Sequence, residues 1–330
     1  MGELITSSPE SLTPKLTPVP VARYRLTFRA RDDIALPEYA GSLLRGQFGS
    51  ALRRTVCVTG ENKCPSCALY RSCVYPAIYE TPAPEHHALQ KFSAVPNPYV
   101  IEPPPTGMPG AHRGEALSFN VVLFGRALAQ LALVVFAFDR AFTQGIGRQR
   151  SQATLEQIEW QTDGNWRSVW DADERRLHEH DPALSMPTFA ATDSLTLAIH
   201  TPLRLQHQGQ PLRVKQVTPR ALLTTLLRRV SLLFDLHTDR RDVIGDPHAL
   251  AEHAQTLTDT RDLRWCDWTR YSSRQRQEMT LGGVIGRWTL HGDLVPFLPW
   301  LWLGQWLHVG KNAVMGMGGY RLEPDIGVAE

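Results

Sequence analysis

Near the start of the chain, apolar and polar residues alternate, which is the pattern of a strand with one buried face. In the segment 22–30 (ARYRLTFRA), aromatic and aliphatic residues fall on one side and arginines on most of the other. After Pro37, which suits the first turn of a helix, apolar residues recur at intervals of three and four as far as Arg54. The pattern predicts a half-buried strand followed directly by an amphipathic helix.

Strand and helix patterns continue to alternate along the rest of the chain. Up to residue 160 they are a strand, a helix and a strand at 116–124, 126–143 and 154–160. From residue 195 onward, strand and helix patterns cover 195–205, 219–234, 263–271, 279–290 and 294–307. Thr218 followed by Pro219 is a typical helix start, because the hydroxyl can cap the first turn. The second series roughly repeats the first, which predicts an α+β chain with two βαββαβ units side by side.

The length of 330 residues also favours two domains over one core. Residues 1–20 are rich in Pro, Ser and Thr and predict a flexible arm. The segment 161–193 is charged and contains prolines, so it predicts the connection between the domains. The predicted boundaries are the arm at 1–20, a first domain at 21–170, a linker at 171–192 and a second domain at 193–325.

The charge and hydropathy patterns exclude some partners. Formal net charge is only +2, so no global positive field attracts nucleic acid, and such binding must come from local patches. Only five of the 35 basic residues are lysine. The arginine bias suits phosphate recognition, although the base composition of the gene would explain it equally well. No apolar run reaches the roughly 20 residues that a membrane span needs, and no export signal opens the sequence, which predicts a cytoplasmic protein with no membrane partner.

Four of the five cysteines lie close together in the first domain. They follow the spacing Cys57-x6-Cys64-x2-Cys67-x5-Cys73, whereas Cys266 stands alone in a predicted strand and suggests a core position. In a reducing compartment, four clustered thiolates favour a metal over disulfides. We expect a structural zinc in the loop 55–80, with an iron–sulfur cluster or free thiols as alternatives. With four thiolate ligands, no position on the zinc would stay open for catalysis.

The segment 308–320 (HVGKNAVMGMGGY) is the clearest local signal for ligand binding. A backbone this rich in glycine can approach a phosphate and direct N–H groups at it, and Lys311 adds a positive charge. The spacing is not that of a Walker loop. The alternative is a simple turn between helix and strand. Its glycines are Gly310, Gly316, Gly318 and Gly319.

Several segments together resemble the RAMP superfamily of CRISPR systems, and within it the endoribonucleases that process CRISPR repeats. The similarity rests on the glycine-rich loop 310–319, the helix 41–53 (GSLLRGQFGSALR) and the turn 145–150 (GIGRQR). Supporting segments are 97–103 (NPYVIEP), 201–205 (TPLRL), 268–275 (WTRYSSRQ) and 282–283 (GG). Their order over residues 22–323 carries the resemblance more than any one motif.

The resemblance implies two tandem ferredoxin-like domains, with the four-cysteine metal loop inserted in the first. It also implies metal-independent cleavage of precursor CRISPR RNA. The ribose 2′-hydroxyl attacks the adjacent phosphate and leaves a 2′,3′-cyclic phosphate and a 5′-hydroxyl. Such chemistry needs a base, an acid and cations for the developing phosphorane charge. Partners would be CRISPR repeat RNA and, as an open alternative, other CRISPR effector subunits.

Family members often carry a catalytic histidine near the first helix, but this helix contains none. The candidate base is therefore His308, which precedes the glycine-rich loop, or a histidine of the loop after the cysteines, or Tyr271. Packing roles are the alternative for each of them. The candidate catalytic residues are His308, Lys311, Tyr271, His87 and His86. The candidate RNA contacts, besides the four glycines, are Arg270, Arg274, Arg148, Arg150 and Arg45.

Two other functions remain possible from sequence alone. A RAMP subunit can bind guide RNA within an effector complex without cutting it. A zinc-stabilised enzyme of small molecules is disfavoured, because the chain has no cofactor fingerprint and no H-E-x-x-H motif.

Overall fold

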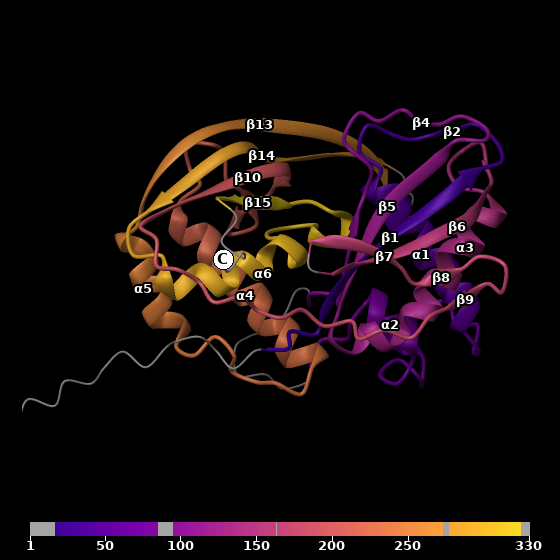
Figure 1. Ribbon diagram of the computed structural model, residues 1–330, viewed down its shortest axis with the longest axis horizontal. Helices are drawn as coiled ribbons and strands as arrows, with labels where there is room; N and C mark the ends of the chain where they lie inside the picture. Colours follow the sequence, from indigo (N-terminus) through magenta and orange to yellow (C-terminus); the bar gives the residue numbers. More distant parts are fainter. Residues whose placement is uncertain (1–16, 85–94, 163, 273–276, 325–330) are drawn as a thin grey trace, which may run out of the picture.

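The computed structural model describes residues 17–84, 95–162, 164–272 and 277–324, with the backbone alone for residues 269–272 and 277–280. Two antiparallel sheets lie side by side along the long axis of the molecule (Figure 1). The main helices α4, α5 and α6 gather on one side of the second sheet, which leaves its other side uncovered. The architecture is a mixed α/β fold.

The N-terminal unit is built on a five-stranded sheet in the order β3-β5-β1-β6-β7. Its strands are β1 (Val21–Ala30), β3 (Tyr99–Glu102), β5 (Ala116–Phe124), β6 (Ala153–Thr162) and β7 (Asn165–Ser168), and its helices are α1 (Gly41–Val56), α2 (Val74–Tyr79) and α3 (Leu131–Gln144). The short strands are β2 (Ile34–Ala35), β4 (Gly110–Ala111), β8 (Trp170–Asp171) and β9 (Arg176–Leu177), and the 3-10 turns are η1 (Cys64–Ser66) and η2 (Gly125–Gln130).

The alternation in β1 places its apolar side chains against α1 and α3. Phe28 stacks on Phe142 of α3 with ring centroids 4.0 Å apart, and Phe48 of α1 stacks on Phe138 at 4.8 Å. All four rings are buried, so the predicted amphipathic strand and helices are confirmed. The opposite face of β1 carries the arginines, which pair with carboxylates of neighbouring strands, as Arg29 does with Glu156 at 2.7 Å.

The C-terminal unit has a four-stranded sheet in the order β13-β14-β10-β15. Its strands are β10 (Ser194–Leu203), β11 (Gln206–His207), β12 (Gln210–Pro211), β13 (Thr258–Ser272), β14 (Gln277–His291) and β15 (Tyr320–Glu323), and its helices are α4 (Pro219–His237), α5 (Pro247–Thr256) and α6 (Leu298–Leu307), with 3-10 turns η3 (Val295–Phe297) and η4 (Ala313–Met315). As expected, Thr218 caps α4, since its hydroxyl accepts from the N–H of Ala221 at 3.1 Å. Helix α6 is buried over most of its length and α3 along one face, with Phe136 of α3 51% exposed. No helix in the described part of the chain is long and apolar enough to cross a membrane.

Both units share one strand order. The four main strands are β1, β3, β5 and β6 in the N-terminal unit, and β10, β13, β14 and β15 in the C-terminal unit. Numbered in chain order, both sets lie side by side in the sheet in the order second, third, first, fourth. The long hairpin β13–β14 extends past its own sheet toward the N-terminal unit (Figure 1). There Trp268 stacks on Tyr39 with ring centroids 4.5 Å apart. The hairpin is therefore one of the links between the units.

Some elements differ from the sequence prediction. The helix predicted from Pro37 begins at Gly41, and the predicted helix 126–143 starts as the 3-10 turn η2. Strand β3 lies in the segment 97–103, for which no strand was predicted. The strands β7 to β9 occupy the first part of the segment 161–193, which was predicted to be a connection. Within the predicted arm, Val19 is buried and bridges to Leu184, so ordered packing begins before residue 21.

Candidate functional site

The glycine-rich loop 310–319 lies between the two units, and its glycines are required by protein contacts. At Gly316, a Cβ would come within 2.6 Å of the carbonyl oxygen of Ile101 on β3. At Gly41, the first residue of α1, a Cβ would lie 2.0 Å from the carbonyl oxygen of Met315. The hydroxyl of Tyr39 donates to that same oxygen at 2.9 Å. The loop is thus pressed against both β3 and the start of α1.

Strand β10 holds the other side of this loop. The Thr201 hydroxyl donates to the carbonyl oxygen of Gly316 at 2.7 Å and accepts from the N–H of Gly319 at the same distance. Residues 315–319 are buried, whereas Lys311 is exposed and Gly310 is half-buried. The predicted close approach to phosphate is thus available at Gly310 and Lys311. Gly316, Gly318 and Gly319 are buried, and a Cβ at any of them would overlap neighbouring protein atoms. Packing within the protein therefore explains these glycines, and their backbone is not exposed to a ligand.

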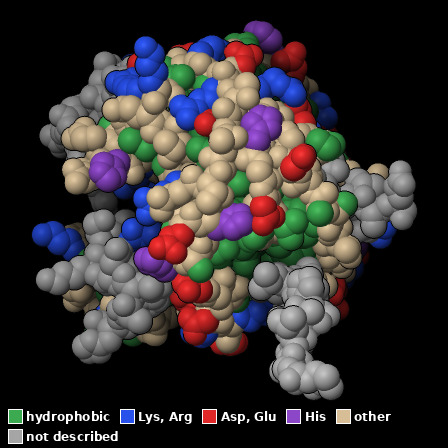
Figure 2. All heavy atoms as spheres, turned by 90° about the vertical axis from the view of Figure 1, so that its left-hand side faces the viewer, with side chains coloured by type: hydrophobic (Ala, Val, Ile, Leu, Met, Phe, Trp, Pro, Cys, Tyr) green, Lys and Arg blue, Asp and Glu red, His purple; other side chains and the backbone are tan. Residues whose placement is uncertain are grey.

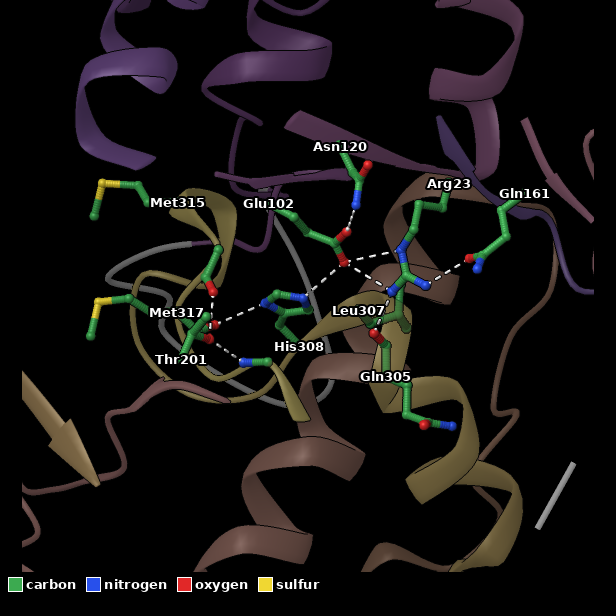
Figure 3. A network of polar contacts seen from close by, with 12 residues as sticks. Arg23, Glu102, Asn120, Gln161, Thr201, Gln305, Leu307, His308, Met315 and Met317 are labelled. Atoms are coloured by element: carbon green, nitrogen blue, oxygen red, sulfur yellow. Dashed lines mark hydrogen bonds and ion pairs between the residues drawn. The ribbon is translucent and has the colours of Figure 1, made fainter. Parts of the chain in front are cut away.

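His308 lies at the centre of a buried polar network that joins the units (Figure 3). It is the C-cap residue of α6, with a φ of 56°, and only 1% of it is exposed. Its Nε2 contacts a carboxylate oxygen of Glu102 on β3 at 3.1 Å, and its Nδ1 contacts the carbonyl oxygen of Met317 at 3.2 Å. Since both nitrogens face acceptors, both hydrogen bonds form only when the ring carries two protons.

Glu102 connects this histidine to the N-terminal sheet. Its carboxylate accepts from the guanidinium of Arg23 at 2.9 Å and from the side-chain amide of Asn120 at 3.0 Å. Arg23 also donates to the carbonyl oxygen of Gln305 on α6 at 2.8 Å. Burial alone would raise the pKa of Glu102, but Arg23 and His308 outweigh it and hold that pKa far below its usual range. This network of Arg23, Glu102, Asn120 and His308 joins the two units, and we call it the clasp.

The burial of His308 revises its proposed role as the general base. A base must reach the 2′-hydroxyl that it deprotonates, and this imidazole has no solvent-facing edge and both nitrogens engaged. His308 is instead a buried residue that caps α6, which is the packing role given above as the alternative for each candidate base. A proton acceptor for the reaction must be sought on an exposed surface.

The other candidate residues are spread over several surfaces. The loop histidines His86 and His87 and the arginine Arg274 lie outside the described residues, and Arg270 and Tyr271 are described by backbone only, at the end of β13. Arg45 is half-buried with its guanidinium 4.4 Å from the ring centre of Tyr79. Arg148 and Arg150 are exposed in the turn after α3, where Arg150 donates to the carbonyl oxygen of Gln144. Their contacts with RNA stay predictions.

The four cysteines line one shallow hollow between the end of α1 and the start of α2. Cys57 is the C-cap of α1, Cys73 is the N-cap of α2, and Cys64 and Cys67 flank the turn η1. Their thiols are free and half-buried. Within the described residues, however, no three Cys, His, Asp or Glu side chains converge closely enough to hold a metal ion. Cys266, expected in the core, is also only half-buried.

Two functional residues were not predicted from the sequence: Glu102, the acidic centre of the clasp, and the exposed histidine His200. Glu102 falls in the segment 97–103, which supported the family resemblance but was not predicted to be a strand. His200 follows the alternating apolar residues of β10, and that alternation already predicts an outward-facing side chain. The contacts of the clasp join residues up to 282 positions apart, so no local pattern could reveal it.

Figure 2 shows the end of the C-terminal unit that faces away from the N-terminal unit, and on this face basic and acidic side chains are interspersed. This agrees with the small net charge of +2. Local arginine and lysine positions, and not a broad field, must therefore contact a polyanion.

Two sheet units with one strand order, joined through a buried glycine-rich loop, define a paired-domain protein of the RAMP type. Residues 17–182, half of the chain, match the model of a family described as an N-terminal domain. Residues 197–320 match the model of the CRISPR-associated endoribonuclease Cas6. The chain belongs to the first of these families, whose model covers half of it. With the Cas6 match in its C-terminal part, it is a Cas6/RAMP-type endoribonuclease that binds and cleaves CRISPR repeat RNA.

Solved structures agree with this fold. The structure titled "Cas6 (TTHB231) product complex" is 17% identical, with a TM-score of 0.54 over 90% of this chain and 97% of that chain. The structure titled "Partial Cas6-RT-Cas1--Cas2 complex" is 15% identical, with a TM-score of 0.53 over 96% of this chain and 48% of that chain. At such identities the likeness concerns the fold alone. A search of the curated proteins finds no match.

Proposed function

We propose that this chain cuts precursor CRISPR RNA once within each repeat by attack of a ribose 2′-hydroxyl on the adjacent phosphate. The O2′–P bond forms, the P–O5′ bond breaks, and the products are a 2′,3′-cyclic phosphate and a 5′-hydroxyl. The hydroxyl loses its proton to a base, and the leaving oxygen gains one from an acid. Side chains can supply both groups and the cations, so the proposed reaction uses no catalytic metal.

One observation carries the proposal: the segment that matches the Cas6 family ends in the glycine-rich loop, and both units hold that loop in place. Its exposed residue Lys311 is anchored by its own N–H, which donates to the carbonyl oxygen of Arg204 at 2.9 Å. This bond holds the backbone of Lys311 at the exposed edge of the loop, and an ammonium there can stabilise charge that develops on a phosphate. We assign Lys311 to the phosphorane contact.

The shared strand order and the one-sided helices support the assignment of both units as tandem ferredoxin-like domains. In this arrangement the uncovered sheet faces and the loop between the units would meet the RNA. Association with further CRISPR proteins is part of the proposal, because a solved relative of this fold is titled as a complex of Cas6 with a reverse transcriptase, Cas1 and Cas2.

Incubation of the purified protein with its repeat RNA in EDTA tests the function. We expect one cut per repeat. Retarded but intact RNA would support the binding subunit, and neither binding nor cleavage would contradict an RNA function altogether.

The cysteine loop carries a separate proposal, a structural zinc bound by Cys57, Cys64, Cys67 and Cys73. The four thiols line one hollow, which supports a common ligand, and binding would have to draw them closer than they lie here. An iron–sulfur cluster would use the same four thiolates. The 16 residues of α1 span about 24 Å, so this loop lies a helix length away from Gly41 and the glycine-rich loop.

Loss of the metal should therefore lower stability and leave the cleavage chemistry of the remaining folded protein unchanged. We expect Cys64→Ser to unfold at lower temperature than the wild type, while Cys266→Ser, outside the loop, unfolds as the wild type does. Elemental analysis of protein purified under reducing conditions measures the metal directly. Less than stoichiometric zinc and iron would contradict the proposal.

A further inference from the structure

The uncovered face of the C-terminal sheet carries an exposed histidine beside the glycine-rich loop. Along β10, the leucines and Ile199 point into the core, and Thr196, Ala198 and His200 point the other way. The His200 N–H donates to the carbonyl oxygen of Gly319 at 3.1 Å, which fixes the backbone of the strand against the loop. Unlike His308, His200 is exposed.

Two arginines flank the same part of this face. Ala198 pairs with Arg287 of β14 on one side and with Arg321 of β15 on the other. Directly opposed residues of antiparallel strands lie on one face, so both cations border the small Ala198 side chain two residues from His200. Both are exposed; Arg287 pairs with Glu323, and no described carboxylate pairs with Arg321. A phosphate group fits between two such cations.

The imidazole of His200 also lies close to that of His308 in the buried clasp. A Cβ at Gly319 would lie 2.9 Å from Nε2 of His200 and 2.8 Å from Cε1 of His308, so the two imidazoles approach each other over this glycine. Partial burial, then the charges of His308 and Arg321, lower the pKa of His200 to about 4 against the opposing effects of Glu102 and of a hydrogen bond to the backbone of Ala198. The ring is therefore neutral at neutral pH and has a lone pair available.

We propose that His200 is the catalytic base of the cleavage reaction, with Arg321 and Arg287 binding the scissile phosphate. The imidazole takes the proton of the 2′-hydroxyl as O2′ attacks phosphorus, the P–O5′ bond breaks, and water protonates the leaving 5′ oxygen. The bound phosphate adds negative charge next to the ring and raises its pKa toward the working pH, which favours proton transfer. This assignment rests on the proposed function and explains why the first helix needs no histidine.

The test is single-turnover cleavage of repeat RNA by His200→Ala at saturating protein. We expect cleavage to slow by about 10²- to 10⁴-fold, while binding of RNA with a 2′-deoxy nucleotide at the cut site changes less than threefold. Added imidazole should restore part of the rate. His248→Ala, which removes an exposed histidine from α5, is the matched control and should cleave as the wild type does.

The pH profile separates a base from a structural residue. The wild-type rate should fall toward acid pH as His200 takes up a proton in the complex, and this acid limb should be absent from His200→Ala. The neighbouring charges are those of His308, Glu102, Arg321, Arg287 and Glu323. Cleavage by His200→Ala within twofold of the wild type, an unchanged acid limb, or equal loss of binding would overturn the assignment. If the wild type itself fails to cut, the proposed function fails instead.

Discussion

Replacing Glu102 by alanine is expected to cost about 3–5 kcal/mol of folding free energy, because the guanidinium of Arg23 would lose its carboxylate partner and His308 its acceptor on β3. Arg23 and Glu102 have side chains only 16% exposed, and His308 has 2%. Little water reaches these groups, so the lost partner is not replaced by solvent. Urea unfolding of the free protein measures the loss.

Glu156→Ala is the matched control, since it removes the carboxylate of an exposed ion pair with Arg29 on the same sheet. Water solvates both charges there, so the loss should stay below about 1 kcal/mol. Similar effects of the two substitutions would mean that the clasp contributes no more than a surface ion pair. In that case the buried network does not hold the units together.

The second large effect is expected from Gly318→Ala. Gly318 has a φ of +72°, and a Cβ there would lie 1.8 Å from the carbonyl oxygen of Val309. The left-handed conformation costs an alanine about 1–2 kcal/mol, and relief of the overlap adds about 1–3 kcal/mol. Because the loop must move, RNA cleavage through Lys311 should decline as well. Gly318 was a candidate RNA contact from the sequence, and the structure gives contacts within the protein as the reason for glycine there.

Gly147 provides the comparison for this variant. It has a φ of +70°, but a Cβ there would meet nothing within 4 Å. Gly147→Ala therefore isolates the conformational cost and should be destabilised by no more than about 2 kcal/mol. Thermal unfolding of both variants gives the difference, and equal melting temperatures would contradict the packing explanation of the glycine-rich loop.

Local patterns predicted the elements whose stability is local. The alternation of β1, the stripe of α1 and the Thr218–Pro219 start of α4 each follow from neighbouring residues. Strand β3 was missed because its four residues are flanked by prolines and are buried by long-range packing. Its partner β5 stabilises it through the register Tyr99↔Leu123 to Glu102↔Asn120. A short strand of this kind has no period long enough to detect.

In the candidate site, too, local patterns predicted some features, and others depend on contacts between distant parts of the chain. Glycine spacing and Lys311 located the loop, but spacing cannot tell whether glycine is needed for a ligand or for a neighbouring strand. The contact of Gly316 with Ile101 comes from the other unit, over 200 residues away in sequence. His308 was singled out by its place beside the loop, whereas its burial depends on Glu102. His200 could be recognised as a candidate only once the positions of β10, β14 and β15 in the sheet were known.

In the proposed reaction the RNA itself supplies the nucleophile, the 2′-hydroxyl next to the scissile phosphate. The most direct measurement is single-turnover cleavage in EDTA of two repeat RNAs that differ only by a 2′-deoxy nucleotide at the cut site. We expect the all-ribose RNA to be cut once, with a 2′,3′-cyclic phosphate and a 5′-hydroxyl at the new ends, and the deoxy RNA to be bound with similar affinity and left intact. Cleavage of the deoxy RNA, or a 5′-phosphate on the product, would contradict the account.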